Sequence, residues 1–158
     1  MKRVFLYPGQ GAQYPGMGKD LYDESAAVRE LFRLAGETAG FDVADLVFNG
    51  SEEELKATDK TQIAITAVNL AAATVIEERG FSSQGAAGFS LGEYAALVDA
   101  GVLEPKDAFL AVRERGMLME EASRALDSEE GSAGMVAAIG KDYAEIVEIL
   151  DAIGLENA

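Results

Sequence analysis

The sequence of 158 residues contains neither cysteine nor histidine. Without cysteine there is no disulfide framework and no thiolate metal site, so nothing points to export, and we expect no bound metal. Without histidine the chain lacks the side chain that most often takes a proton from a catalytic hydroxyl group. Any serine nucleophile in this sequence therefore raises the question of which group acts as its base.

Basic residues and long apolar runs are also scarce. The chain has 13 Lys and Arg residues against 28 Asp and Glu residues. The resulting net charge of −15 disfavours nucleic acid and anionic membranes as partners. The longest apolar stretch, Ile63–Ile76, spans 14 residues and contains Asn69, so it is too short for a bilayer span and is typical of a buried helix. The N-terminal residues lack the pattern of a signal peptide, and we expect a cytoplasmic protein.

The residues that are present predict an α/β fold. Hydrophobic residues make up 49% of the chain, which is enough for a sizeable core. A β-rich stretch at 3–7 is followed by a glycine-rich loop, and α/β proteins commonly bind ligands at such loops. Apolar periodicity predicts helices at about 24–38, 62–79 and 105–123, and a capping-box pattern at 51–54 opens a short acidic helix.

The pattern changes near residue 126. An acidic stretch with glycine and serine at 126–134 breaks the helical periodicity and indicates a boundary. A short apolar stretch at 135–140 and a helix at about 142–153 then form one further βα unit. The sequence therefore predicts that this last unit belongs to a second, separate part of the protein.

Ser90 lies in a G-x-S-x-G pattern, between Gly88 and Gly92, after a weakly predicted strand and before an apolar helix. The pattern is typical of a nucleophile elbow, a sharp strand-to-helix turn that lifts a serine hydroxyl clear of the backbone. The Leu91 N–H would then stabilise an oxyanion, and the loop at 9–11 is the only strong candidate for a second donor. The alternatives are a chance match in a glycine-rich chain and an ordinary flexible turn at that loop.

Arg115 falls on the apolar side of the predicted helix at 105–123. The other residues of that stripe are Ala108, Val112, Met119 and Ala122. A guanidinium that faces a core needs an anionic partner, because an unpaired buried charge is costly. Arg115 could clamp a substrate carboxylate, with Gly116 leaving room beside it, or it could reach solvent or pair with one of the many carboxylates of the chain.

Five motifs occur in order, “FLYPGQGAQYPGMG”, “TQIAIT”, “GFSLGEYAALVDAG”, “VRERGMLMEEA” and “GMVAAIG”. Together they resemble the malonyl-CoA:acyl carrier protein transacylase family, to which the acyltransferase domains of polyketide and fatty acid synthases are similar. The resemblance runs from Arg3 to about Gly140 and covers only the first half of the family's length. It implies a hydrolase-like α/β body with a parallel sheet, interrupted by a small ferredoxin-like subdomain. The chain then looks truncated after the first βα unit of that insert, with 1–127 in the body and 128–158 at the start of the subdomain.

The resemblance also implies a role for each matching residue. Ser90 would accept the malonyl group from CoA as an ester, and the N–H groups of Gln10 and Leu91 would form the oxyanion hole. Arg115 would hold the malonyl carboxylate and Gln62 would line the pocket, while a leucine after the serine is similar to the malonyl-selecting members. Malonyl-CoA and the phosphopantetheine thiol of acyl carrier protein would be the substrates, in fatty acid or polyketide synthesis, and no cofactor is expected.

Two departures separate the sequence from the family's pattern. Phe89 stands where the family usually has histidine, and its ring neither donates nor accepts a hydrogen bond. The family's general base is a histidine from the second half, so the resemblance implies that the C-terminal half of the same enzyme is a further partner. The remaining alternatives are a non-catalytic acyl-binding or scaffold fragment and a serine hydrolase, the latter disfavoured by Arg115.

Overall fold

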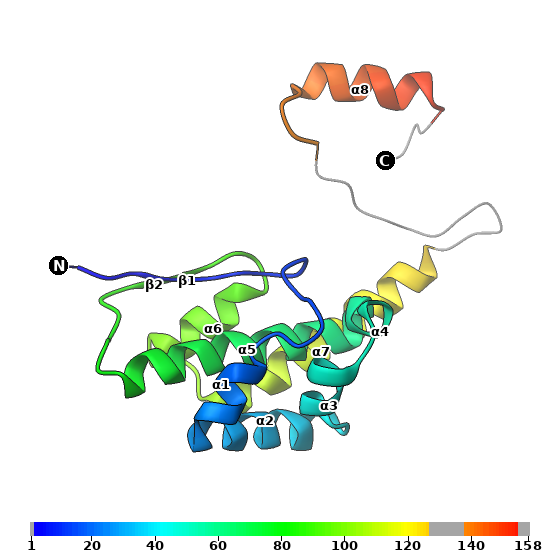
Figure 1. Ribbon diagram of the computed structural model, residues 1–158. Coiled ribbons are helices and arrows are strands. Elements are labelled where there is room, and N and C mark those ends of the chain that lie inside the picture. The colour runs from blue at the N-terminus through cyan, green and yellow to red at the C-terminus, as the bar shows by residue number, and fades with distance from the viewer. Residues whose placement is uncertain (1, 127–137, 155–158) are drawn as a thin grey trace. The chain divides into compact units, whose positions relative to one another are not determined.

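The computed structural model describes residues 2–126 and 138–154, and the chain divides into two compact units, Met1–Ala122 and Ser123–Ala158. The predicted boundary at 127/128 lies outside the described residues, as does the predicted strand up to residue 137, and residues 138–140 form no strand. In chain order the elements are β1 (Phe5–Tyr7), α1 (Lys19–Glu24), α2 (Ala26–Ala39), α3 (Val43–Asn49), α4 (Glu52–Lys56), α5 (Thr58–Glu78), β2 (Ala86–Gly88), α6 (Gly92–Asp99), α7 (Pro105–Ala125) and α8 (Tyr143–Ala152) (Figure 1).

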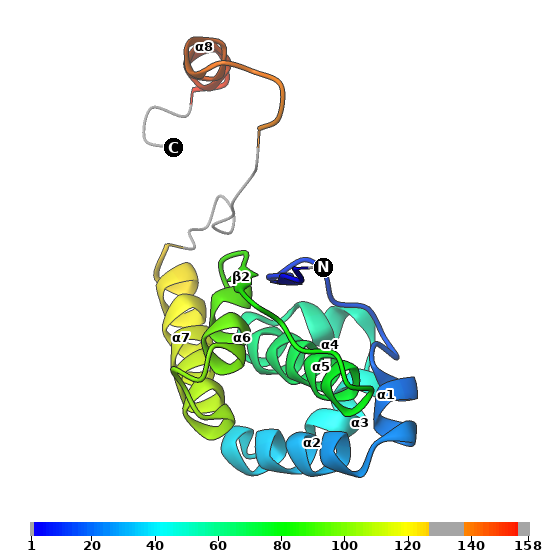
Figure 2. The ribbon, with the colours of Figure 1, turned by 90° about the vertical axis from the view of Figure 1, so that its left-hand side faces the viewer.

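The two strands form a small parallel sheet, which confirms the predicted α/β class. Phe5 pairs with Ala86 and Tyr7 with Gly88, and the helices of the first unit lie on one side of the sheet (Figures 1 and 2). Tyr7 is buried against these helices, whereas Leu6, which points to the opposite face, is 76% exposed. Parallel sheets are normally covered on both faces, so this one presents a bare apolar face.

Helix α5 is the centre of the first unit and contacts α1 to α4 and α6. Its side chains are buried without a break from Thr61 to Ala67, as expected of a core helix. It begins four residues before the predicted start at 62, because the N–H groups of Lys60 and Thr61 donate to the carbonyl oxygen of Ala57 and close a polar first turn. No helix among the described residues combines the length and apolarity needed to cross a membrane.

Local signals placed most helix ends correctly. The capping box at Ser51 and Glu54 is confirmed, and Gly80, with φ +83, follows the end of α5 as predicted. The two short helices α1 and α3 were not predicted from the sequence. Asp42 was an available signal for α3, because its side chain accepts from the Asp45 N–H and caps this helix. Such short helices contain too few turns for apolar periodicity to be recognised.

Ser25 fixes the start of α2 and also ties it to α5. Its hydroxyl oxygen accepts from the Val28 N–H at 3.2 Å, and the hydroxyl donates to Glu78 at 3.0 Å. Because Ser25 is only 3% exposed, water does not replace either bond easily. A single buried hydroxyl therefore joins two helices of the core.

We expect Ser25→Ala to lower the free energy of unfolding by about 1–2 kcal/mol, since it removes a helix cap and a buried hydrogen bond together. Urea denaturation followed by circular dichroism would measure the change. Ser82→Ala, at an exposed loop position, is the matched control and should stay within about 0.5 kcal/mol of the unmodified protein. Equal effects of the two substitutions would contradict the role of Ser25.

Candidate active site

Ser90 lies in a strained backbone conformation between β2 and α6. Its φ is 50°, and it is the only non-glycine residue with positive φ among the described residues. An L-residue in this region costs roughly 1–2 kcal/mol, and such strain is typical of sites where the backbone is held for a purpose. The side chain is exposed, so the predicted strand-to-helix turn does lift the hydroxyl clear.

The two glycines of the G-x-S-x-G pattern are required by the backbone around them. A Cβ on Gly88 would lie 2.0 Å from the carbonyl carbon of Gly92, and a Cβ on Gly92 would lie 2.1 Å from the carbonyl oxygen of Tyr7. No side chain fits at either position without a shift of the backbone. Close packing therefore accounts for both glycines of the pattern, as the geometry of the predicted strand-to-helix turn requires.

The glycine-rich loop after β1 is held against this turn. A Cβ on Gly9 would lie 2.4 Å from the Phe89 carbonyl oxygen, and the Asn69 side chain donates to the carbonyl oxygen of Pro8 at 3.0 Å. The N–H groups of Gln10 and Leu91 donate to no other residue within the described ranges. The loop is thus not the ordinary flexible turn considered above, and two unused backbone donors flank the packed contact.

Arg115 connects the serine to the core. Its Nη2 donates to Ser90 Oγ at 3.3 Å, and its Nη1 donates to Gln62 Oε1 at 2.7 Å. Gln62 is fully buried on α5, and its Nε2 donates to Met119 Sδ at 3.2 Å. The fold therefore brings together Ser90, Gln62 and Arg115, which are far apart in the sequence and belong to separate elements.

The surroundings of Arg115 decide between the alternatives considered for it. The guanidinium forms no ion pair with any carboxylate in the described part of the chain, and its side chain is half-buried rather than extended into solvent. Its partners are a neutral amide and a hydroxyl. The positive charge is thus uncompensated and faces Ser90, which leaves it available to an anionic ligand.

Two details of the predicted apolar stripe on α7 are wrong. Ala122 is exposed, whereas Ala108 and Val112 are buried as predicted and form the buried seam together with Phe109 and Gly116. Gly116 leaves no room for a ligand, since a Cβ there would lie 3.0 Å from the carbonyl oxygen of Thr58. Because Gly116 lacks a side chain, α7 can pack closely against the first turn of α5 at this position, and Arg115 comes next to it in the chain.

The Ser90 hydroxyl donates no hydrogen bond to any of the described residues. The hydrogen bond to its hydroxyl comes from Arg115, a group that stays protonated in proteins. Burial raises the pKa of the Tyr7 phenol far above its usual range, and the carboxylates of Asp99 and Glu77 raise it further, so Tyr7 stays neutral at pH 7. The described residues also contain no group of three metal-ligating side chains.

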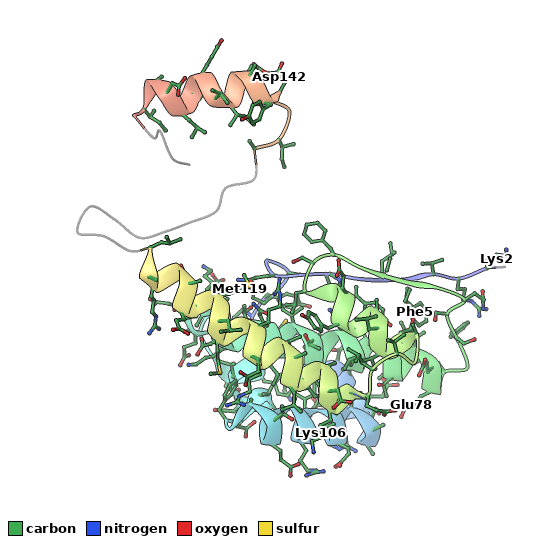
Figure 3. All side chains as sticks on the ribbon, turned by 180° about the vertical axis from the view of Figure 1, so that it is seen from behind. Lys2, Phe5, Glu78, Lys106, Met119 and Asp142 are labelled. Carbon is green, nitrogen blue, oxygen red and sulfur yellow. The ribbon has the colours of Figure 1, made fainter. Side chains whose placement is uncertain are left out.

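Two further residues support the site, and neither was given a role in it from the sequence. Asn69 anchors the loop and Met119 accepts from Gln62. Met119, labelled in Figure 3, lies four residues after Arg115, so one helical turn places both residues on the same side of α7. That spacing was the available signal for Met119, whereas a contact between Asn69 and the loop has no local signature.

Comparisons with known proteins show the family to which the chain is similar. A family model described as the acyl transferase domain matches residues 4–142. The malonyl CoA-acyl carrier protein transacylase of Bacillus subtilis is 41% identical over 156 residues, which cover 99% of this chain and 48% of that protein. The chain thus spans about half the length of the curated relatives it matches.

Solved structures are similar over the same region. The acyl-carrier-protein-S-malonyltransferase of Bartonella henselae aligns with a TM-score of 0.79 at 32% identity, covering 99% of this chain and 49% of that one. A malonyl-transacylase in complex with its type II PKS acyl-carrier protein aligns with a TM-score of 0.73 at 42% identity, covering 77% of this chain and 40% of that one. Both support the α/β arrangement with parallel strands.

The strain at Ser90 predicts an unusual order of stabilities. Both Ser90→Gly and Ser90→Ala remove the hydroxyl, but only glycine adopts positive φ without cost, so we expect the Gly variant to unfold with a free energy about 1 kcal/mol higher than the Ala variant. Urea denaturation of the two variants would measure the difference. An Ala variant as stable as the Gly variant would show that the backbone at Ser90 is not strained.

Proposed function

The chain belongs to the acyl transferase domain family, and we propose that it is the N-terminal part of an enzyme that transfers malonyl from coenzyme A to the phosphopantetheine thiol of an acyl carrier protein. Relatives that carry this name support the substrate class. The observation that carries the proposal is the strained Ser90 with the Arg115 guanidinium 3.3 Å from its hydroxyl. CoA and phosphopantetheine are substrates in this proposal, and no cofactor takes part.

The proposed reaction has two acyl transfers through a serine ester. Ser90 Oγ attacks the thioester carbonyl, its proton passes to a base, the Oγ–C bond forms, and the C–S bond breaks to release CoA, whose sulfur takes up the proton. The carrier thiol then attacks the ester and restores the serine. The N–H groups of Gln10 and Leu91 are assigned to the oxyanion, because both are unused and flank the elbow.

Arg115 selects an acyl group that carries its own carboxylate. In a malonyl ester the carboxylate carbon lies three bonds from Oγ, roughly 4 Å away when extended, which is within reach of a guanidinium that already contacts Oγ. The carboxylate replaces the neutral Ser90 hydroxyl as the acceptor, so that both donor and acceptor of the hydrogen bond are charged. The Leu91 side chain is only 1% exposed and packs in the core, so Leu91 acts here through its N–H.

The base is assigned to a histidine outside these 158 residues, in the remaining half of the enzyme. The bare face of the sheet supports this assignment, because Val4, Leu6 and Phe89 are 60%, 76% and 76% exposed. A parallel sheet of two strands needs further strands and a cover on this face. We propose that residues 1–127 belong to a hydrolase-like body and that 128–158 begin the inserted ferredoxin-like subdomain.

The carrier protein is expected to dock elsewhere. Carrier proteins are typically acidic, and this chain has a net charge of −15, so like charges disfavour docking on most of its surface. The docking patch is assigned to the remaining half or to a local cluster of basic residues. The rival function is a non-catalytic acyl-binding fragment, which the absence of a base beside Ser90 within the described residues favours.

Complementation separates the enzyme from the non-catalytic fragment. Residues 1–158 alone should show almost no malonyl transfer, because a serine without a base is a weak nucleophile at neutral pH. Co-expression with the second half of the Bacillus subtilis relative should restore transfer to a carrier protein, measured with radiolabelled malonyl-CoA. Robust transfer by the purified chain alone would show that the base has been misplaced. Binding of the two halves without transfer would favour the non-catalytic function.

In the complemented enzyme, Arg115→Ala should reduce transfer of malonyl far more than transfer of acetyl. Loss of the charge-assisted bond between Arg115 and the malonyl carboxylate costs about 2–3 kcal/mol. Acetyl has no carboxylate and makes no such bond, so its transfer is not affected in this way. The kcat/KM values for malonyl-CoA and acetyl-CoA give the comparison. Arg113→Ala is the matched control, because Arg113 pairs with Glu114. Equal losses for both acyl groups would return Arg115 to a structural role.

A further inference from the structure

The amide of Gln62 is held between a cation and a sulfur atom. Its Oε1 accepts from Arg115 Nη1 at 2.7 Å, and its Nε2 donates to Met119 Sδ at 3.2 Å. The side chain has no exposed surface. Water is therefore unavailable to replace either partner, and the two protein contacts decide how the amide is oriented.

Only one orientation of this amide is favourable. After a rotation of 180°, the amide nitrogen would face the guanidinium, placing two donors together, and the amide oxygen would face the sulfur, placing two acceptors together. The thioether is a weak acceptor, and it opposes this rotation together with the guanidinium. A neutral acceptor on the cation also leaves the positive charge of Arg115 intact.

The helix contact makes the arrangement possible. Gly116 lets α7 approach the first turn of α5, where a Cβ would lie 3.0 Å from the Thr58 carbonyl oxygen. Arg115 and Met119 are one helical turn apart and therefore lie on either side of Gln62. Figure 3 shows Met119 in the C-terminal half of α7.

We propose that Met119 is a positioning residue that orients the Gln62 amide, so that Arg115 is held ready for a carboxylate-bearing acyl group. The inference rests on the proposed function and assigns a specificity-determining residue to it. Without the sulfur acceptor, the Gln62 amide is held by the guanidinium alone, so the amide is more mobile and the guanidinium is less firmly fixed. Binding of a carboxylate-bearing acyl group then weakens, while binding of an acyl group without a carboxylate is unchanged.

Met119→Leu tests the proposal, because leucine is close to methionine in volume and removes only the acceptor. Binding of S-malonyl- and S-acetyl-N-acetylcysteamine to the full chain would be measured by NMR titration. We expect the dissociation constant of the malonyl thioester to rise roughly fivefold, as expected for one modest hydrogen bond, and that of the acetyl thioester to stay within about 1.5-fold. Met117→Leu is the matched control, since Met117 is 45% exposed on the same helix.

A double-mutant cycle separates positioning from simple packing. If Met119 acts through Gln62, Met119→Leu should cause no further loss of malonyl binding in a Gln62→Leu background. The ¹H–¹⁵N spectrum of each variant reports whether it is folded. It also shows the Gln62 side-chain amide, which should shift and broaden in Met119→Leu and stay unchanged in Met117→Leu.

The outcomes distinguish this inference from the proposed function. An unmodified protein that binds both thioesters equally would contradict the carboxylate clamp, and the Gln62 amide signal would then test the positioning role alone. A malonyl preference that survives Met119→Leu, additive losses in the double variant, or an unchanged amide signal would each overturn the role of Met119 and leave the proposed function standing.

Discussion

The close approach of backbone segments around Ser90 is the constraint on which the site depends. A Cβ on Gly9, Gly88 or Gly92 would lie 2.4 Å or less from a backbone atom of a neighbouring segment. The turn has no room to relax, so Ser90 is held at positive φ with its hydroxyl outward. The same packing places the loop with Gln10 beside the start of α6. Strain at one residue is thus maintained by contacts of its neighbours.

The cation of the site is the Arg115 guanidinium, which forms no ion pair with a carboxylate of the described residues. The chain has more than twice as many acidic as basic residues, yet the guanidinium of Arg115 is held by the neutral amide of Gln62. An acidic partner would hold the side chain equally well but would cancel its charge. A buried amide supplies the hydrogen bond and preserves the charge, which is what recognition of an anionic group requires.

Two features of the first unit are incomplete within the described residues. The sheet has two strands and an apolar face without a cover in the described part of the chain, and Ser90 contacts a donor but no acceptor there. One feature concerns stability and the other chemistry. A single segment that extends the sheet and carries a base would satisfy both.

The sequence by itself determined the elements whose signals are local: the capping box at Ser51, the αL glycine after α5, the elbow at Ser90 and the core character of α5. It also identified Arg115 by its position on an apolar stripe. Only the tertiary structure decided how α7 is rotated against α5, and hence that Gly116 makes the helix contact, that Ala122 is exposed and that Met119 reaches Gln62. Periodicity records which side of a helix is apolar, but the surface of the partner helix decides which residues touch it.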